Sequence, residues 1–271
     1  MPEHGHSPLT HVVDQPTLEL PTFRYPYGWE FNLERATGLT RFMFSELVAA
    51  VLVAVVAIFL ARHVRREHVT RGRLMNTFEA MVLFIRDQVA RPAIGGHAAD
   101  AFLPYLWTLF FFILFNNLLG LIPGFASATG NINVTGVLAV MTLGTVILAG
   151  MRELGPVGFW VGIVPHLDVP FLLKLPLWGL MFVIEIAGLL IRHIVLAVRL
   201  FANMFAGHIV LAVILGFILQ AMGTFMFYPV TTASLVGVIL LSLLEVFVAF
   251  LQAYIFVFLS ALFIGSAVHP H

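Results

Sequence analysis

The sequence contains no cysteine, and only 10% of its 271 residues are charged. The first absence excludes a disulfide framework, a thiolate metal site and a cysteine nucleophile. The second excludes an ordinary soluble surface, because soluble domains use roughly 25% charged residues. With 60% hydrophobic residues and a mean hydropathy of +0.99, the chain is predicted to be an integral membrane protein.

Positive charge is unevenly distributed although the net charge is zero. Half of the 14 Lys and Arg residues lie between positions 62 and 91: Arg62, Arg65, Arg66, Arg71, Arg73, Arg86 and Arg91. By the positive-inside rule this cluster marks the cytoplasmic side of the membrane. We therefore expect a multi-pass protein with a cytoplasmic C-terminus and with its N-terminus on the opposite side, which is the periplasm in a bacterium.

The first 40 residues form a separate, polar segment that we expect in the periplasm. They do not combine a basic start with an apolar core, so we expect no cleavable signal peptide. His4, His6 and His11 could bind a metal, but scattered terminal histidines are usually solvated, and we expect no metal site. Several prolines argue against a long helix here.

Residues 41–271 are predicted to form one membrane domain. Five apolar segments are long enough to cross roughly 30 Å of hydrocarbon: about 42–61, 102–122, 134–151, 176–220 and 229–268. Apolar residues at helical spacing over about 74–91 predict an amphipathic surface helix that ends at Pro92 and the Gly95–Gly96 pair. The proline-containing stretch 155–174 is interpreted as a re-entrant or surface connection. The fold class is all-α.

The last two apolar segments are longer than a membrane is thick. At 1.5 Å per residue they would measure on the order of 65 and 60 Å if continuous. Either each breaks into a re-entrant hairpin, or the two form one hairpin of helices tilted by roughly 60° that lean on a partner surface. The spacing of their polar residues favours the second arrangement.

Polar side chains in these two segments fall on defined helix faces. Glu185, Arg192 and Arg199 are seven residues apart and share one stripe, which Asn203 extends. His208 follows Arg199 by nine residues and faces the opposite way. Ionisable residues at membrane depth are costly, so each is a hypothesis of function.

The second long segment carries Glu245 and Gln252 on one face. An antiparallel hairpin would bring His208 and Glu245 together in the periplasmic half, and Gln252 level with Arg199. Glu185 falls toward the cytoplasmic half.

A purely structural interpretation is that these residues only pin the helices together. Apolar replacements of such pairs are often neutral or stabilising, so packing alone does not require these charges. We therefore favour a functional role for Arg199. For Arg192 and Asn203 the functional and structural interpretations are nearly balanced. His193 could simply cap or pack. Asn116 and Asn117 are interpreted as joining helices by hydrogen bonds in preference to lining an ion path.

The chain contains the motifs RLFANMFAGH from Arg199 to His208, LQAYIF from Leu251 to Phe256, NNLLGLIP from Asn116 to Pro123, SATGNINVT and RDQVARPAIG. Together these motifs resemble subunit a of the F-type ATP synthase membrane sector. The resemblance implies a non-catalytic subunit that abuts a ring of c subunits, each with a mid-membrane carboxylate. Two offset half-channels against that ring would couple proton flow to rotation and ATP synthesis.

The resemblance also implies roles for individual residues. Arg199 matches the family's essential Arg, which attracts the passing ring carboxylate and blocks a direct leak. Glu185 matches the position nearest the cytoplasmic exit. The positions that match the border of the periplasmic half-channel are Asn203, His208, Glu245 and Gln252.

This sequence departs from some family members in three places. His208 and Glu245 are exchanged, Gly120 stands where some members have Asp, and Arg192-His193 stands where some have Lys-Pro. The role of Arg192 therefore stays open. Asn117 is also kept as a possible residue of the proton path, beside the helix-joining interpretation.

The implied partners are the c-ring, the peripheral-stalk subunit b, the remaining ATP synthase subunits and the lipid bilayer, with no cofactor and no nucleic acid. No G-x-x-x-x-G-K-[ST] loop occurs, so ATP chemistry would belong to other subunits. The alternatives are a stand-alone ion-coupled secondary transporter, for which we find no internal repeat, and a structural assembly subunit. In this family the choice between protons and sodium ions resides mainly in the ring.

Overall fold

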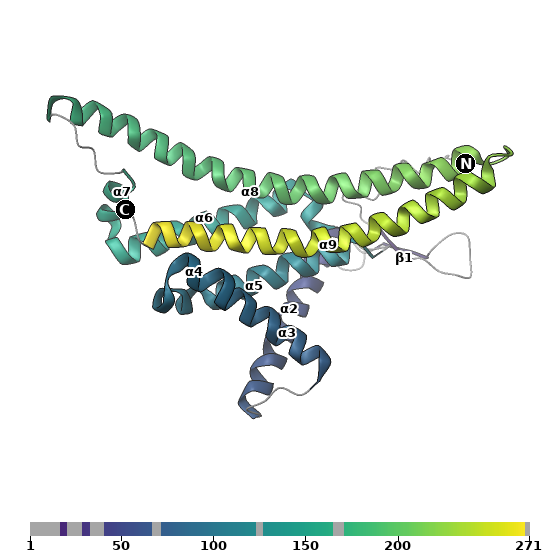
Figure 1. The fold of residues 1–271 in the computed structure, drawn as a ribbon, viewed down its shortest axis with the longest axis horizontal. Helices are drawn as coiled ribbons and strands as arrows, with labels where there is room; N and C mark the ends of the chain where they lie inside the picture. The colour runs from purple at the N-terminus through teal and green to yellow at the C-terminus, as the bar shows by residue number, and fades with distance from the viewer. Residues whose placement is uncertain are drawn as a thin grey trace. The chain divides into compact units, whose positions relative to one another are not determined.

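A computed structural model describes residues 17–20, 29–32, 41–66, 72–122, 127–164 and 171–268. Most of these residues are helical (Figure 1). The described residues also include an antiparallel pair of strands, β1 (Thr17–Leu20) and β2 (Trp29–Asn32). The helical class is confirmed for the membrane domain, whereas the strand pair was not predicted. The three histidines considered for metal binding lie outside the described residues.

Three helices of ordinary length match the first three predicted spans. They are α2 (Arg41–Arg66), α5 (Gly96–Gly120) and α6 (Ile132–Leu154). With the two longer helices, the described part of the chain has five helices long and apolar enough to cross a membrane. The predicted number of spans is therefore confirmed.

The last two spans are each one helix, as Figure 1 shows. Helix α8 (Phe171–Ala221) has 51 residues and α9 (Phe227–Val268) has 42. At 1.5 Å per residue they are about 76 and 63 Å long. The alternative of two broken, re-entrant segments is therefore wrong. Helix α8 begins before its predicted start and carries Pro176 inside it, near its N-terminal end.

The predicted amphipathic helix is a succession of three helical segments of two types. Helix α3 (Arg73–Phe84) continues as a π-helix, η1 (Ile85–Ala90), and then as α4 (Arg91–Ile94). Pro92 does not end the helix, since it occupies the first turn of α4, where a missing N–H is tolerated. Gly95 ends it, with a φ of 98° that favours glycine.

Helix α4 approaches α9 closely at Gly265. A Cβ at this glycine would collide with the carbonyl oxygen of Ala93 and lie 3.3 Å from the Cα of Ile94. Both obstacles are backbone atoms, which no rotamer change can remove. The absence of a side chain at Gly265 therefore sets how closely the amphipathic segment packs on α9.

The connection after α6 also contains a helix. Helix α7 (Pro156–Gly162) begins after Gly155, whose φ is 78°, and has proline in its first turn. Seven residues of the predicted connection over 155–174 are therefore helical, and its re-entrant or surface character stays a prediction. Phe159 is buried, and its ring occupies the space that a side chain on Gly150 would need.

The chain divides into two compact units. Unit 1 combines Met1–Val56, Phe111–Ile132 and Leu200–Ala253, and unit 2 combines Ala57–Phe110, Asn133–Arg199 and Tyr254–His271. Each long helix contributes one part to each unit. The site residues are therefore described unit by unit.

Candidate functional site

In unit 1 a carboxylate occupies the space beside a glycine of α8. A Cβ on Gly207 would collide with Oε1 of Glu245 and lie 3.2 Å from its Cδ. Seven residues further along α8, Ile214 lies 3.8 Å from where a Cβ on Gly237 would stand. These contacts establish an antiparallel pairing of the unit 1 parts of α8 and α9.

The Glu245 carboxylate is incompletely satisfied. Its Oε2 is buried and has no hydrogen-bond partner among the described residues. A buried polar atom without a partner costs about 1–3 kcal/mol, more if charged. Such a group at membrane depth points to function. The carboxylate lies beside Gly207, the residue that precedes His208 in the chain. The predicted pairing of His208 with Glu245 stays a prediction.

Asn117 joins three elements of unit 1. Its Oδ1 accepts a hydrogen bond from the Thr129 hydroxyl at 2.7 Å, and its Nδ2 donates to the Ala249 carbonyl oxygen of α9 at 3.4 Å. Thr129 belongs to a short 3-10 helix, η2 (Ala128–Gly130), and its hydroxyl is 3.1 Å from that of Ser127. These hydrogen bonds join α5 to η2 and to α9. The bond to α9 is made one turn after Glu245.

The remaining predicted residues of unit 1 differ in exposure. Gln252 on α9 is buried, with 3% of its surface exposed, whereas Asn203 on α8 is exposed. The placement of Gln252 at the same depth in the membrane as Arg199 stays a prediction.

In unit 2 the α8 stripe carries Glu185, Arg192 and Arg199. Glu185 and Arg199 are half-buried and Arg192 is exposed. Arg199 forms no ion pair with any residue that the structure describes. A guanidinium does not lose its proton in proteins, so this charge persists.

Glu185 and Arg192 line one cavity of about 310 Å³ in unit 2. Its walls come from α6, α7, α8 and α9, and Ser266 of α9 adds a hydroxyl. That hydroxyl donates to the Phe263 carbonyl oxygen at 2.9 Å. Ser266 cannot be singled out from the sequence, because nothing distinguishes this residue within the apolar run around it.

His193 packs inside unit 2, as one interpretation expected. It is 3% exposed, and its ring centroid lies 5.1 Å from that of Phe263. Its Nδ1 is 2.8 Å from the Leu189 carbonyl oxygen. Because a carbonyl can only accept, Nδ1 carries the proton in this arrangement.

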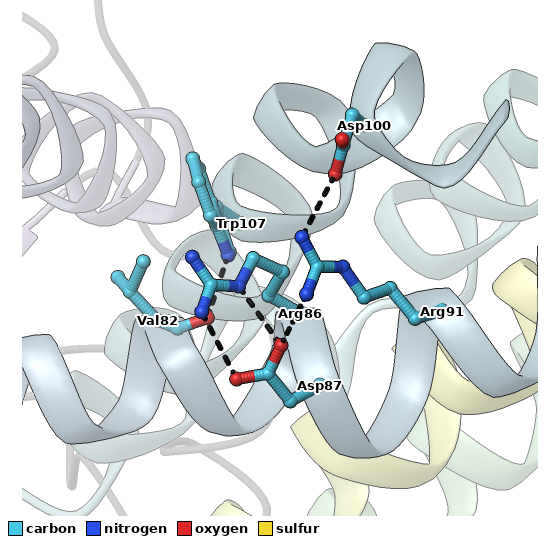
Figure 2. A network of polar contacts seen from close by, with 6 residues as sticks. All are labelled: Val82, Arg86, Asp87, Arg91, Asp100 and Trp107. Atoms are coloured by element: carbon cyan, nitrogen blue, oxygen red, sulfur yellow. Dashed lines mark hydrogen bonds and ion pairs between the residues drawn. The ribbon is translucent and has the colours of Figure 1, made fainter. Parts of the chain in front are cut away.

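A polar network joins η1 and α4, which lie outside the candidate spans, to Asp100 near the start of α5 (Figure 2). The Arg86 guanidinium donates to both oxygens of Asp87, at 2.9 and 3.1 Å. Arg91 donates to Asp87 at 3.2 Å and lies 3.8 Å from Asp100 of α5. The hydrogen bond from Arg86 holds the pKa of Asp87 below its ordinary value, and the same bond raises the pKa of Arg86.

Comparisons with known proteins identify the family. A family profile described as ATP synthase A chain matches residues 43–265. ATP synthase subunit a of Anaeromyxobacter dehalogenans is 45% identical over 211 residues, which cover 77% of this chain and 52% of that protein. ATP synthase subunit a 2 of Chlorobaculum tepidum is 41% identical over 270 residues, covering 96% of this chain and 72% of that protein.

The subunit a of Myxococcus xanthus is 41% identical over 232 residues, covering 83% of this chain and 72% of that protein. The chain spans about half the length of the Anaeromyxobacter dehalogenans relative. With a profile match over most of its length, and five apolar helices in its described part, the chain belongs to the ATP synthase A chain family of multi-pass membrane proteins.

Proposed function

We propose that this chain conducts protons through the membrane sector of an F-type ATP synthase and couples their flow to rotation and ATP synthesis. The observation that carries the proposal is Arg199, a permanent cation within a 47-residue apolar span, without an ion pair among the described residues. A charge of this kind needs an anion from outside the described chain. Relatives named ATP synthase subunit a supply the context.

The anion in this proposal is the carboxylate of a passing c subunit. Arg199 attracts it when deprotonated and repels protons that would cross directly from one side to the other. Helices of about 76 and 63 Å fit this arrangement only when steeply tilted, and the c-ring is the surface on which they lean.

Two half-channels lead protons to and from the ring. On the periplasmic side, Glu245 and His208 exchange protons, with Asn203 and Gln252 along the path and Asn117 holding α9 in place. On the cytoplasmic side, Glu185 exchanges protons with the cavity of unit 2.

The chain itself catalyses no reaction. Subunit b and the remaining subunits complete the complex in a bacterial inner membrane, and ATP chemistry takes place in those partners. The N-terminus lies in the periplasm and the C-terminus in the cytoplasm. A stand-alone transporter is not favoured, since the family is one of ATP synthase subunits.

The substitution Arg199→Lys tests the proposal. A lysine ammonium is compact and can lose its proton, so we expect ATP synthesis by energised membrane vesicles to fall by at least about tenfold. Arg152→Lys is the matched control, because Arg152 is exposed at the end of α6 and should keep wild-type synthesis. Equal amounts of assembled complex are verified on native gels. Wild-type synthesis in Arg199→Lys would overturn the proposed function.

A further inference from the structure

We infer that Arg192 is a positioning residue that holds the Glu185 carboxylate in place across the unit 2 cavity and makes this carboxylate the route for protons there. This inference rests on the proposed function. It assigns a role to a cation that the resemblance left open.

The first support is the path of the Arg192 side chain. Its Nη2 lies 3.9 Å from where a Cβ on Gly188 would stand. The guanidinium therefore extends back along α8, over a residue without a side chain. Gly188 is one turn from Arg192 and one turn from Glu185, so all three share a face. The charge of Arg192 is thus directed toward Glu185.

The second support is the shared cavity. Glu185 and Arg192 both line it, yet no ion pair within 4.0 Å joins them in the described structure. A volume of about 310 Å³ has room for several water molecules, each of which needs polar partners. Two charged side chains and the Ser266 hydroxyl provide such partners. Water can therefore bridge the two charges.

The third support is the scarcity of other charges. Among the described residues that line the cavity, Glu185 and Arg192 are the only ionisable ones. Arg152 and Glu153, at the end of α6, are exposed and lie outside the lining. His193 is buried behind Arg192 against Phe263. Glu185 and Arg192 are therefore the two charged groups that can interact across the cavity.

A fixed cation next to an exchangeable carboxylate has two effects. It attracts the carboxylate and limits its orientations, and it repels a hydronium ion that would pass without using the carboxylate. Protons then cross the cavity by way of Glu185. Both effects depend on the charge and its placement, and not on the shape of the arginine side chain.

The experiment measures ATP-driven proton pumping and ATP hydrolysis by the complete complex in membrane vesicles. In Arg192→Gln we expect pumping per ATP hydrolysed to fall by about tenfold, as for loss of a supporting residue. Arg192→Lys should restore at least about half of wild-type pumping, because it restores a positive charge. Gly188→Leu keeps both charges but fills the space of the guanidinium, and it should resemble Arg192→Gln.

The control for the leucine is Gly179→Leu on the same helix, where nothing lies within 4 Å of the added carbon and pumping should stay normal. In a Glu185→Gln background, Arg192→Gln should cause no further loss, because the group that Arg192 positions is already absent. Equal losses in both backgrounds, or failure of lysine to rescue, would show a packing role and overturn the inference.

Failure of this inference is distinguishable from failure of the proposed function. Normal pumping in Arg192→Gln with impaired pumping in Glu185→Gln would overturn the role of Arg192 and leave the proposed function standing. Normal pumping in both Glu185→Gln and Arg199→Lys would overturn both.

Discussion

Gly207 has no side chain, and this absence leaves room beside α8 for another group. The Glu245 carboxylate lies in the space that any other side chain at position 207 would fill. We expect Gly207→Ala to displace this carboxylate and to lower proton pumping by at least about tenfold, since small displacements of reacting groups are costly. Overpacking should also destabilise the α8–α9 pairing by about 1–3 kcal/mol.

The matched control is Gly216→Ala on the same helix, where nothing lies within 4 Å of the added carbon. Pumping by vesicles that contain each variant distinguishes the two positions. Equal pumping in both would contradict the role assigned to Gly207.

Individual candidate residues can be recognised in the sequence wherever they interrupt an apolar run, and their roles stay predictions. Glu185, Arg199 and Glu245 are visible in this way because charge is rare in membrane segments. Their surroundings were not visible. The contact of Glu245 with Gly207, and the cavity that Glu185 shares with Ser266, arise from residues distant in sequence that periodicity cannot pair.

The η1 segment carries a charge network whose stability depends on pH. Asp87 has a lowered pKa in the folded protein because Arg86 donates hydrogen bonds to its carboxylate. Its interactions therefore stabilise the fold at pH values above the ordinary value of 3.8, and this stabilisation is lost as the pH falls through the lowered pKa.

The substitution Asp87→Asn tests this direction of the pH dependence of stability. We expect the variant to have a slightly lower thermal midpoint than the wild type at pH 7, since the two side chains are 34% and 39% exposed and solvent screens the pair, and no difference at a pH below the lowered pKa. Thermal unfolding of the purified chain in detergent measures both. Glu153→Gln, an exposed residue on α6, serves as the control. A difference that persists unchanged at acid pH would contradict this account.

The packing of α4 on α9 depends on Gly265. Gly265→Ala would place a carbon against the Ala93 carbonyl oxygen, so the two backbones must separate. We expect a loss of stability of about 3 kcal/mol or less, seen as a lower thermal midpoint in detergent. Gly144→Ala on α6, where the added carbon meets nothing within 4 Å, should leave the midpoint unchanged or higher. Identical midpoints in the two variants would refute the close-packing argument.

The sequence predicts helices well where the length of an apolar run sets their bounds. It predicts them poorly where local steric effects set those bounds. The five spans follow from apolar runs, and the continuity of α8 follows from the spacing of its polar residues. Pro92 was misjudged because a proline that ends one helical segment can equally stand in the first turn of the next. Helix α7 is seven residues long, too short for a periodic signal.

Across the whole chain, the sequence predicts a membrane protein with two overlong helices and a charged stripe. It does not predict that unit 1 and unit 2 divide each of those helices. Such a division depends on which segments pack together, and packing depends on side-chain shape. Charge and hydropathy patterns carry no information on that shape.

The indole of Trp107 on α5 gives this protein a natural optical probe. Its N–H donates to the Val82 carbonyl oxygen in the last turn of α3, at 3.1 Å, just before the π-helix begins (Figure 2). A π-helix shifts the backbone hydrogen-bond pattern, so this outside donor stabilises the junction of the two helical types. Indole emission depends on hydrogen bonding and local polarity, and the fluorescence of Trp107 therefore reports whether the amphipathic segment is seated on α5.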